Sequence, residues 1–469
     1  MKRNLLILLS LFVIGSCQKS LPHIEENQCL STVAPAQRYK SSQQDGLFTV
    51  SITDAIRFAE IHNKIGQLIT IKPFCIEKDT LLYFCYYDKE VLVLSGDKRM
   101  PPVLARLYET DLEIDDLPLG LKVWINSIAD DVRTTRLYSK DGENNNTLFW
   151  RSISSTGKQL INSRTKSDGD CKWYAVEHYE YTGSIDNDVV PHLIQTKWGQ
   201  GYPWNSKCPI DNSLTPPIRC YLGCTATATG QVLYYTHSFL GKPNGLYHDI
   251  SCYGSVFGKT TNIGFSRDNY VSNSSRWNMM AADRYSSSMA ISYAEDLMLD
   301  VGNRFGMKYS GSGSGAWPSV SALNSFYDIS CYSGDYDSSP VVSNLYNGMP
   351  TIIVAFSSTD HSIGHTWIID GLHQTEMQYL CYKHFFYGEE WYMASEYYDT
   401  WEDVRDQYHH LIQDPSEDYI CPWSYTSLYY LMNWGYDGLY DNNLYGLYSS
   451  WNANQSDHLY NRVMYYGFH

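Results

Sequence analysis

The sequence predicts an α+β protein in which a helical subdomain and an antiparallel β subdomain follow an α+β N-terminal part. Three observations support this prediction. Apolar residues make up 43% of the 469 residues and charged residues 18%, which is typical of a globular chain with a large core. Segments with helical spacing and segments with strand character occur in both halves of the chain. A polar, turn-rich run, residues 139–171, separates the two halves.

The first residues of the chain are typical of an export signal. Two basic residues precede about a dozen apolar ones, a stretch too short to span a bilayer. Small residues follow at Gly15 and Ser16, directly before Cys17, and this pattern resembles the lipobox of bacterial lipoproteins. We therefore expect residues 1–17 to be a lipoprotein-type signal peptide that leaves a lipidated Cys17 on the outer membrane or cell surface. The alternative is a plain signal peptide with an incidental cysteine, and the chain is exported in both cases.

Charge and cysteine content exclude some classes of function. The net charge is −16 and no basic stripe occurs, which argues against a nucleic-acid partner. Of the twelve cysteines, an odd number remains once Cys17 is set aside, so at least one thiol is free or paired between chains. Cys208, Cys220 and Cys252 are disulfide candidates whose pairing the sequence does not assign. Because no CxxC motif or His/Cys pair with zinc spacing occurs, we expect no metal site and no cofactor.

The N-terminal half predicts a polar tether and then a small α+β unit. "FTVSITDAIRFAEIHNKI", residues 48–65, has helical spacing of apolar residues, whereas "TLLYFCYY" and "EVLVLSG" predict two strands joined by a charged turn. The polar run that follows predicts a linker with processing sites; the alternative is a long surface loop within one domain. We place the domain boundary near residue 185, so that the first domain spans 18–185, with a processing linker over 139–185, and the second spans 186–469.

The C-terminal half predicts helices first and strands later. One helix begins at Cys224 and another covers residues 287–305. The Gly/Ser loop "YSGSGSGAW" follows; it is not a phosphate-binding loop, because it lacks a lysine and does not join a strand to a helix in the required way. Strands "TIIVAF" and "HTWIIDG" come next, and then a β region rich in glycine and tyrosine.

Cys224 is a candidate nucleophile because of its place at the start of a helix. The helix dipole favours the thiolate there and lowers the thiol pKa. Gly223 permits a tight turn just before it, and residues 225–230 carry no bulky side chain. A buried structural thiol, half of a disulfide and a nucleophile all fit this local pattern, and the pattern alone favours the buried thiol.

His365 is the best-placed base for such a nucleophile. A reactive cysteine needs a base, usually histidine, that the fold brings near. His365 opens a predicted strand 141 residues after Cys224, within the gap of roughly 130–150 residues expected of papain-like cysteine proteases. Strand alternation puts His365, Trp367 and Ile369 on one face, whereas Asp370 points away, so we expect Asp370 to be structural.

These segments together resemble the streptopain family of bacterial cysteine peptidases, a branch of the papain-like class. "GCTATATGQVLYYTH" is similar to the nucleophile motif of that family, "GHTWIIDG" to its histidine motif and "MNWGYDG" to its Asn-Trp-Gly motif. "WGQGYPWNSKCP" resembles the segment before the nucleophile, and "AEDLMLDVGNRFGMKYSGSGSGA" the helix and specificity loop. "YYDKEVLVLSGDKRMPPVLA" is similar to the inhibitory propeptide. The resemblance covers most of residues 50–445 in the expected order.

The resemblance implies a papain-like fold of two subdomains behind an inhibitory propeptide, and a cysteine endopeptidase that acts on proteins or peptides. Cys224 would be the nucleophile and His365 the general base and acid. Gln200 would donate to the oxyanion together with the backbone N–H of Cys224. Asn433 and Trp434 would orient and shield His365.

The same resemblance implies two residues of the substrate groove, and the sequence differs from the family pattern in two places. Ser314 and Gly364 would line the substrate groove. The family usually has a second Trp and a Gly after Asn-Trp-Gly, where this chain has Tyr436 and Asp437, and this change could alter the groove or lower activity. The connection over residues 372–432 is long for the family, and we expect this insertion to cap or restrict the cleft.

The resulting hypothesis is a secreted or lipid-anchored zymogen whose propeptide acts as an intramolecular inhibitor until proteolysis removes it. The zymogen would be tethered to the membrane and the mature enzyme would be diffusible. Two alternatives stay open. One is a catalytically impaired relative that binds peptides or proteins, and the other is an acyl-transferring enzyme or amidase that uses the same Cys/His pair.

Overall fold

The computed structural model describes residues 48–469 except for 63, 110–111, 113, 140–143, 155–170, 242–252, 257–258, 263–273, 357–363, 389–395, 410 and 448–461. The predicted signal peptide, Cys17 and Cys252 therefore lie outside the described residues.

The N-terminal part contains the predicted helix and strands. α1 begins after Ser51, whose side chain accepts from the Asp54 amide in a capping box. Two more strands and two more helices follow. The bounds are α1 Ile52–Ile61, β1 Leu68–Ile76, β2 Asp79–Tyr87, β3 Val91–Ser95, β4 Val103–Leu107, the 3₁₀ turn η1 Ile114–Asp116, α2 Leu119–Tyr138 and α3 Asn145–Ser154.

The remaining elements alternate between short strands, helices and three long strands. Their bounds are β5 Lys172–Val190, β6 Ile210–Asp211, β7 Ile218–Arg219, α4 Cys224–Leu240, β8 Tyr253–Val256, β9 Lys259–Asn262, α5 Ser274–Asn278, α6 Ser288–Arg304, β10 Lys308–Tyr309, α7 Val320–Tyr327, β11 Tyr332–Asp335, α8 Ser338–Tyr346, β12 Thr351–Phe356, β13 Gly364–Gly388, β14 Glu396–Tyr398, α9 Trp401–Gln407, β15 Tyr419–Asn433, β16 Leu444–Gly446 and β17 Arg462–Tyr466.

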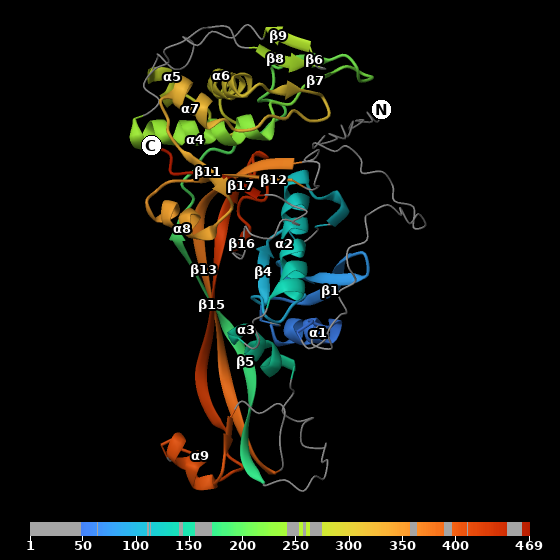
Figure 1. Cartoon of the computed structure of the whole chain (residues 1–469), viewed down its shortest axis with the longest axis vertical. Coiled ribbons are helices and arrows are strands. Elements are labelled where there is room, and N and C mark those ends of the chain that lie inside the picture. Colours follow the sequence, from blue (N-terminus) through green and yellow to red (C-terminus); the bar gives the residue numbers. More distant parts are fainter. Residues whose placement is uncertain are drawn as a thin grey trace, which may run out of the picture.

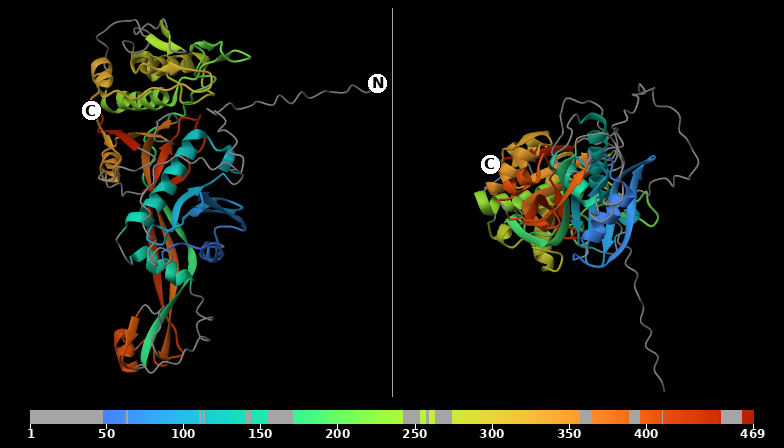
Figure 2. Two further views of the ribbon diagram at one scale, coloured as in Figure 1. Left: turned by 45° about the vertical axis from the view of Figure 1, so that its right-hand side comes forward. Right: turned by 90° about the horizontal axis from the view of Figure 1, so that it is seen from below.

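One large antiparallel sheet runs through both parts of the chain. Its order is β1-β2-β3-β4-β16-β15-β13-β12-β17-β11, and β5 pairs with β13 on a branch of this path. The N-terminal strands join the rest through β4 and β16, where Leu444 lies opposite Arg106 and Tyr445 opposite Ala105. The helices α4, α5, α6 and α7 gather at one end of the sheet (Figures 1 and 2). The predicted α+β class, with a helical part and an antiparallel β part, is confirmed.

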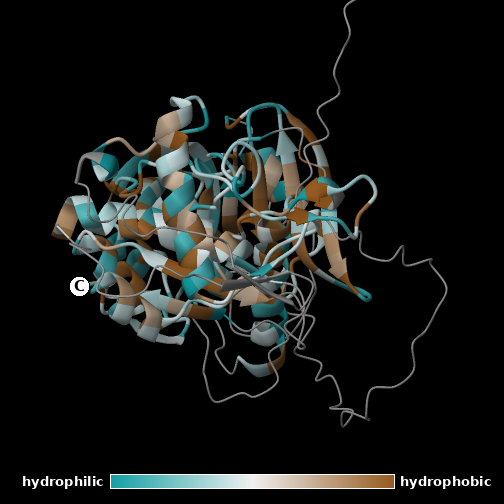
Figure 3. Cartoon of the chain, turned by 90° about the horizontal axis from the view of Figure 1, so that it is seen from above, coloured by the Kyte–Doolittle hydropathy of each residue, from teal (hydrophilic) through white to brown (hydrophobic). Residues whose placement is uncertain are grey.

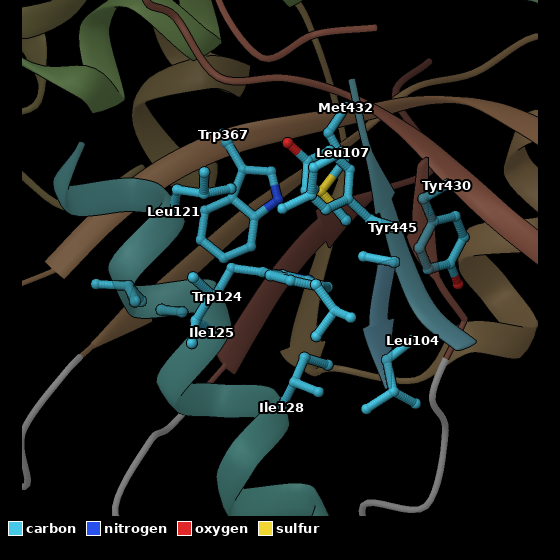
Figure 4. Close-up of a cluster of buried hydrophobic side chains, with 14 of the residues drawn as sticks. Leu104, Leu107, Leu121, Trp124, Ile125, Ile128, Trp367, Tyr430, Met432 and Tyr445 are labelled. Atoms are coloured by element: carbon cyan, nitrogen blue, oxygen red, sulfur yellow. The ribbon is translucent and has the colours of Figure 1, made fainter. Parts of the chain in front are cut away.

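Two apolar cores hold these layers together. The first surrounds α4 and α6 and includes the fully buried Trp198, Trp204 and Trp277. Viewed from this end of the molecule, hydrophobic and hydrophilic residues are interspersed (Figure 3), and α4 buries every residue from Thr225 to Leu233. The second core lies between α2 and the sheet, where Trp124 of α2 packs near Trp367 of β13 (Figure 4). This second core is shared by the N-terminal part and the C-terminal half.

The region expected to be a processing linker contains regular structure. α3 lies within it, and β5 runs without interruption from Lys172 to Val190 through the predicted boundary at 185. The exposed residues of β5 lie from residue 180 onward, at 180, 182 and 184–188, and this half contains Ser, Asp and Asn, which gave the segment the composition of a loop. Residues 140–143 and 155–170 of the expected linker lie outside the described residues.

The insertion over residues 372–432 does not cap the helical end of the molecule. It forms β13 from Leu372 onward and all of β15 except Asn433, which pair with each other, and it carries α9 at its tip. This arm extends away from α4 (Figure 1). The expectation of a cap over the cleft was wrong, because residues 419–426 alternate between half-buried and exposed positions and continue the sheet.

Candidate active site

Cys224 is the first residue of α4, and the turn before it requires glycine. Gly223 has φ +94°, and a Cβ at this position would lie 2.8 Å from Cε of Met307 and 3.0 Å from the carbonyl oxygen of Ser314. The first turns of α4 then use small side chains, and Gly230 packs on Met298 of α6. Cys224 itself stays partly exposed at the end of the helix. The local sequence thus presents a thiol at a helix N-terminus.

His365 is brought to Cys224 by neighbouring contacts of β13 and α4. The hydroxyls of Thr225 and Thr366 lie 2.9 Å apart, and Thr225 donates to the carbonyl of Ala316 at 2.7 Å. The residue after Cys224 and the residue after His365 are therefore held together. Burial raises the pKa of the Cys224 thiol, but the charge of His365 and contacts with His365 and Thr366 lower it more, so the pKa falls from 9.0 to about 7.

Both ring nitrogens of His365 have partners. Nε2 lies 3.0 Å from the carbonyl oxygen of Trp434. Because a carbonyl only accepts hydrogen bonds, Nε2 carries a proton and donates it. Nδ1 lies 3.3 Å from the hydroxyl of Tyr436. The Tyr436 ring also stacks on the imidazole, with centroids 4.9 Å apart and planes 16° apart.

Trp434 lies where the expected shielding role would place it. Its ring is fully buried and lies beside both His365 and Trp367, with centroid distances of 6.2 Å and 5.1 Å, and these two rings are 6.2 Å from each other. Its amide donates to Oδ1 of Asp441 at 3.0 Å, and its indole N–H donates to the hydroxyl of Tyr445 at 2.9 Å. The backbone carbonyl that faces His365 is therefore fixed on both sides.

Asn433 makes its hydrogen bonds elsewhere. Its amide group donates to the carbonyl of Thr196 at 2.9 Å, and its oxygen accepts from the side chain of Gln231 at 2.9 Å and the amide of Gly435 at 3.1 Å. These hydrogen bonds of the Asn433 side chain thus go to Thr196, Gln231 and Gly435 and not to His365, which it was expected to help orient. Asn433 joins β15 to α4 through Gln231, and the group that orients His365 is the Trp434 carbonyl.

The segment before the nucleophile lies beside it. The backbone carbonyl of Gln200 accepts from the amide of Leu222 at 2.9 Å, two residues before Cys224, and the Gln200 side chain is largely buried. Asp437 anchors this segment, because its carboxylate accepts from the indole of Trp204 at 2.6 Å. A Cβ on Gly199 would lie 2.7 Å from the same carboxylate. The departure at Asp437 therefore makes a contact that fixes the segment containing Gln200.

Ser314 lies near the turn that precedes Cys224, and Gly364 directly precedes His365. The Ser314 hydroxyl accepts from the Ser310 amide at 2.9 Å within its own loop, and its carbonyl lies against Gly223. Gly364 pairs with Phe356 across β12 and β13, and a Cβ there would lie 2.7 Å from the Phe356 ring. The predicted place of both residues in a substrate groove stays a prediction.

The N-terminal part also reaches His365, which sequence reasoning missed. Gly120 in the first turn of α2 lies so close that a Cβ would be 2.3 Å from Cδ2 of His365. The Gly120 amide donates to the Tyr436 hydroxyl at 3.1 Å. The sequence signalled Tyr436 as a departure from the family pattern, but no local motif marks Gly120, Thr225 or Thr366.

Asp370 lies in a separate polar cluster. Its carboxylate accepts from Nδ1 of His192 at 3.0 Å and from the amide of Ile194 at 3.0 Å. This matches the prediction that Asp370 supports the fold. Asp441, which holds Trp434, interacts with the same cluster, and burial is the main reason that its pKa rises to about 7.

The described residues contain no disulfide, and nine of their cysteines are free thiols, Cys208 and Cys220 among them. Within the same part of the chain, no group of three or more His, Cys, Asp and Glu side chains could hold a metal ion. None of the helices described here is both long and apolar enough to cross a membrane.

Comparison with known proteins identifies the family to which the chain belongs. The model of the Peptidase C10 family matches residues 198–443, which is more than half of the chain and includes Gln200, Cys224, His365 and Trp434. No curated protein matches the chain. Two solved structures from Prevotella intermedia align with it. A mutant fragment of prointerpain A has 17% identity, covers 84% of this chain and 98% of its own, and gives a TM-score of 0.46. The active wild-type interpain A cysteine protease has 21% identity, covers 61% and 95%, and gives a TM-score of 0.37.

Proposed function

This chain belongs to the peptidase C10 family of cysteine peptidases, and on that premise we propose that it is the zymogen of an endopeptidase with Cys224 as nucleophile and His365 as base. The observation that carries the proposal is the place of Cys224 at the start of α4, where the 2.9 Å contact between the Thr225 and Thr366 hydroxyls holds it beside His365. Burial alone would raise the pKa of the Cys224 thiol, and His365 instead lowers it to about 7. A thiol with this pKa is substantially ionised at neutral pH and needs no stronger base.

The proposed reaction is acyl transfer to sulfur. The Cys224 thiolate attacks the carbonyl carbon of a peptide bond, and the electron pair of the carbonyl moves to its oxygen. The imidazolium of His365 gives its proton to the leaving amine, which departs and leaves a thioester on Cys224. Water then attacks the carbonyl carbon of the thioester while His365 takes a proton from it, the C–S bond breaks with its electron pair returning to sulfur, and the carboxylic acid is released from the regenerated Cys224 thiolate.

The developing oxyanion is assigned to the backbone N–H of Cys224 and the side-chain amide of Gln200. The hydrogen bond between the Gln200 carbonyl and the Leu222 amide supports this assignment, because it holds Gln200 next to the start of α4. A preorganised donor of this kind is worth about 3–4 kcal/mol in acyl transfer. We expect Gln200→Ala to lower kcat about 10²-fold or more.

The N-terminal part is proposed to inhibit the enzyme from within the chain. The close contact of Gly120 with His365 supports this, because a substrate cannot approach the imidazole from the side that α2 occupies. The shared core around Trp124 and Trp367 holds α2 in that place. Protein or peptide substrates would gain access once this part is displaced.

Export and lipid attachment are proposed from the sequence of residues 1–17 alone. A lipidated Cys17 would tether the zymogen to the outer membrane, and removal of the N-terminal part would free the enzyme. We expect Cys17→Ala to move the zymogen out of the membrane fraction. Finding the mature fragment solely in the membrane fraction would contradict this proposal.

Hydrolysis of a casein-type substrate tests the proposed activity. We expect the processed protein to cleave the substrate, and an irreversible thiol inhibitor and Cys224→Ala to abolish cleavage. Mass spectrometry of the fragments gives the maturation site and the cleavage preference. Cys331→Ala is the matched control, because Cys331 is a buried thiol outside the candidate site. No cleavage after verified processing and removal of the N-terminal fragment would favour the impaired, peptide-binding relative instead.

A further inference from the structure

The arm formed by β13 and β15 places two cysteines directly opposite each other. Cys381 of β13 pairs with Cys421 of β15, in an antiparallel register that runs without a shift from Gly371 to Lys383. Residues in such positions have their side chains on the same face of the sheet and their Cα atoms about 4.5–5.5 Å apart. This separation lies within the range of about 4.4–6.8 Å that disulfides span. The backbone of the arm is therefore already arranged for the two sulfur atoms to bond.

The packing of the arm supports the same placement. Cys381 is a buried member of the aromatic cluster that includes Tyr379, and Cys421 packs against this cluster beside Trp423. Burial, followed by the charges of Glu177 and Cys421, raises the pKa of the Cys381 thiol to about 12. Because such an effect of one charge on another falls off with distance, it agrees with two neighbouring sulfur atoms.

A covalent link at this place would fasten an edge strand. Within the described part of the chain, β16 covers the outer edge of β15 only near Tyr429 and Tyr430, so the distal part of β15 pairs with β13 alone. Edge strands open more easily than strands paired on both sides. β14 and α9 follow Cys381 and precede Cys421 along the chain, and they lie at the tip of the arm (Figure 1). A link between the two cysteines would therefore close off the tip.

We propose that Cys381 and Cys421 form a disulfide that fastens β15 to β13. The oxidant is a small disulfide or a dithiol–disulfide oxidoreductase, the classes that act where exported proteins fold. The Cys421 thiolate attacks one sulfur of the oxidant, and the other sulfur leaves as a thiolate. The Cys381 thiol then loses its proton and attacks the Cys421 sulfur, so that the remaining sulfur of the oxidant leaves. Two protein thiols are oxidised and one disulfide of the oxidant is reduced, whether or not Cys224 is a nucleophile.

Oxidation with glutathione tests this link in the full chain. The chain carries Cys224→Ala, which removes the reactive thiol of the candidate site, and is held in oxidised glutathione at about tenfold excess over reduced glutathione. After an acid quench, alkylation and digestion, mass spectrometry should find one peptide pair joined through Cys381 and Cys421, about 2 Da lighter than the two reduced peptides together. Cys331→Ser is the matched control, because Cys331 is a buried thiol of the core around α4, and it should leave the link unchanged.

The two single variants should differ, because Cys421 is half-buried whereas Cys381 is 2% exposed. Cys381→Ser should leave Cys421 as a mixed disulfide with glutathione. Cys421→Ser should leave Cys381 as a free thiol, since the oxidant does not reach it. Hydrogen exchange of residues 419–426 should be at least about threefold slower in the oxidised chain, because the link restrains opening of the edge strand. Dithiothreitol should reverse this slowing, and Cys421→Ser should abolish it.

Three results would overturn the disulfide. They are separate alkylation of Cys381 and Cys421 in the oxidising buffer, a glutathione adduct on Cys421 while Cys381 is present, and a link from Cys421 to another cysteine. The same buffer with urea, in which the buried Cys331 also reacts, verifies that the oxidant is active. A link that forms without slowing the hydrogen exchange would contradict the fastening of β15.

Discussion

At the residue scale, the candidate site depends on polar groups that are buried but paired. Cys224 is desolvated, yet His365 lies close enough to reverse the effect of burial on its pKa. His365 in turn is held by the Trp434 carbonyl, and the Trp434 amide by Asp441. A single buried carboxyl thus supports the backbone group that orients the imidazole.

Asp441→Asn tests this support through the pH dependence of stability. Burial raises the pKa of Asp441 to about 7 in the folded chain, above its unfolded value of 3.8. Its contribution to stability is therefore fully present below about pH 4 and is lost as the pH rises through about 7. An asparagine oxygen still accepts from the Trp434 amide but never ionises. We expect Asp441→Asn to exceed the wild type in free energy of unfolding by about 1–3 kcal/mol at pH 8 and not at pH 4.

Chemical denaturation at both pH values measures this difference. Asp335→Asn, on an exposed aspartate at the edge strand β11, is the control and should change stability little at either pH. A gain for Asp441→Asn that is the same at pH 4 and pH 8 would mean that ionisation of this carboxyl is not the cause.

The residues expected to take part in the reaction were easier to predict from the sequence than the groups that hold them in place. Cys224, His365 and Gln200 follow from a helix start, a strand start and a resemblance, and the structure brings Cys224 and His365 together. Asn433 was assigned to His365, but it bonds Gln231 instead. The partner of Nε2 is a backbone carbonyl, which no side-chain motif can mark.

At the element scale, the start of α4 depends on a conformation that only glycine adopts easily. Gly223 and Gly241 stand at the two ends of this helix with φ +94° and +70°. A Cβ at Gly223 would meet Met307 and the Ser314 carbonyl, whereas a Cβ at Gly241 would meet nothing within 4 Å. An alanine at either position would be strained by the positive φ, but only an alanine at Gly223 would also overlap its neighbours. Comparing the two variants therefore distinguishes the cost of backbone strain from the cost of steric overlap.

We expect Gly241→Ala to cost about 1 kcal/mol of unfolding free energy, since backbone strain is its only penalty. Gly223→Ala should cost at least about 1 kcal/mol more, because overlap adds to strain. It should also slow Cys224 labelling, since the thiol is displaced from His365. Urea denaturation of both variants measures the difference. Equal losses would mean that α4 can shift to accept the methyl group, which would contradict a rigid start of the helix.

Sequence patterns predicted elements best where most of the side chains are buried. The apolar spacing of α1, α6 and the strands β2, β3 and β12 matched the structure. β5 and β15 were missed because polar residues predominate in the exposed half of β5 and exposed positions alternate with half-buried ones along β15. The pairing of β5 with β13 joins residues far apart in the chain and leaves no local signal.

At the scale of the whole molecule, the N-terminal part is not a separate lobe on a linker. β4 pairs with β16 in one continuous sheet, and α2 shares its core with Trp367 and Met432 of the C-terminal half (Figure 4). The sequence predicted two domains from a polar run and a change of composition. It could not show that the two parts share a core, because core sharing depends on contacts across hundreds of residues.

A single cut between the two parts should therefore not separate them. We expect a chain with a site-specific protease site introduced within residues 155–170 to keep both fragments together after cutting. Size-exclusion chromatography in native buffer should give one peak with both fragments, and the same column in urea should give two. Separation in native buffer would contradict the shared core, and the uncut chain is the control for elution volume.

The central claim is that His365 activates Cys224 as a nucleophile, and the pH profile of Cys224 alkylation tests it most directly. Site-resolved labelling of the wild type and of His365→Ala gives the profile, with the exposed Cys75 of the same chain as a reference for reagent and pH. We predict a midpoint near pH 7 for Cys224 in the wild type. In His365→Ala the midpoint should rise above pH 9, because burial then acts without the opposing charge. A Cys224 midpoint that is the same in both proteins would contradict the account.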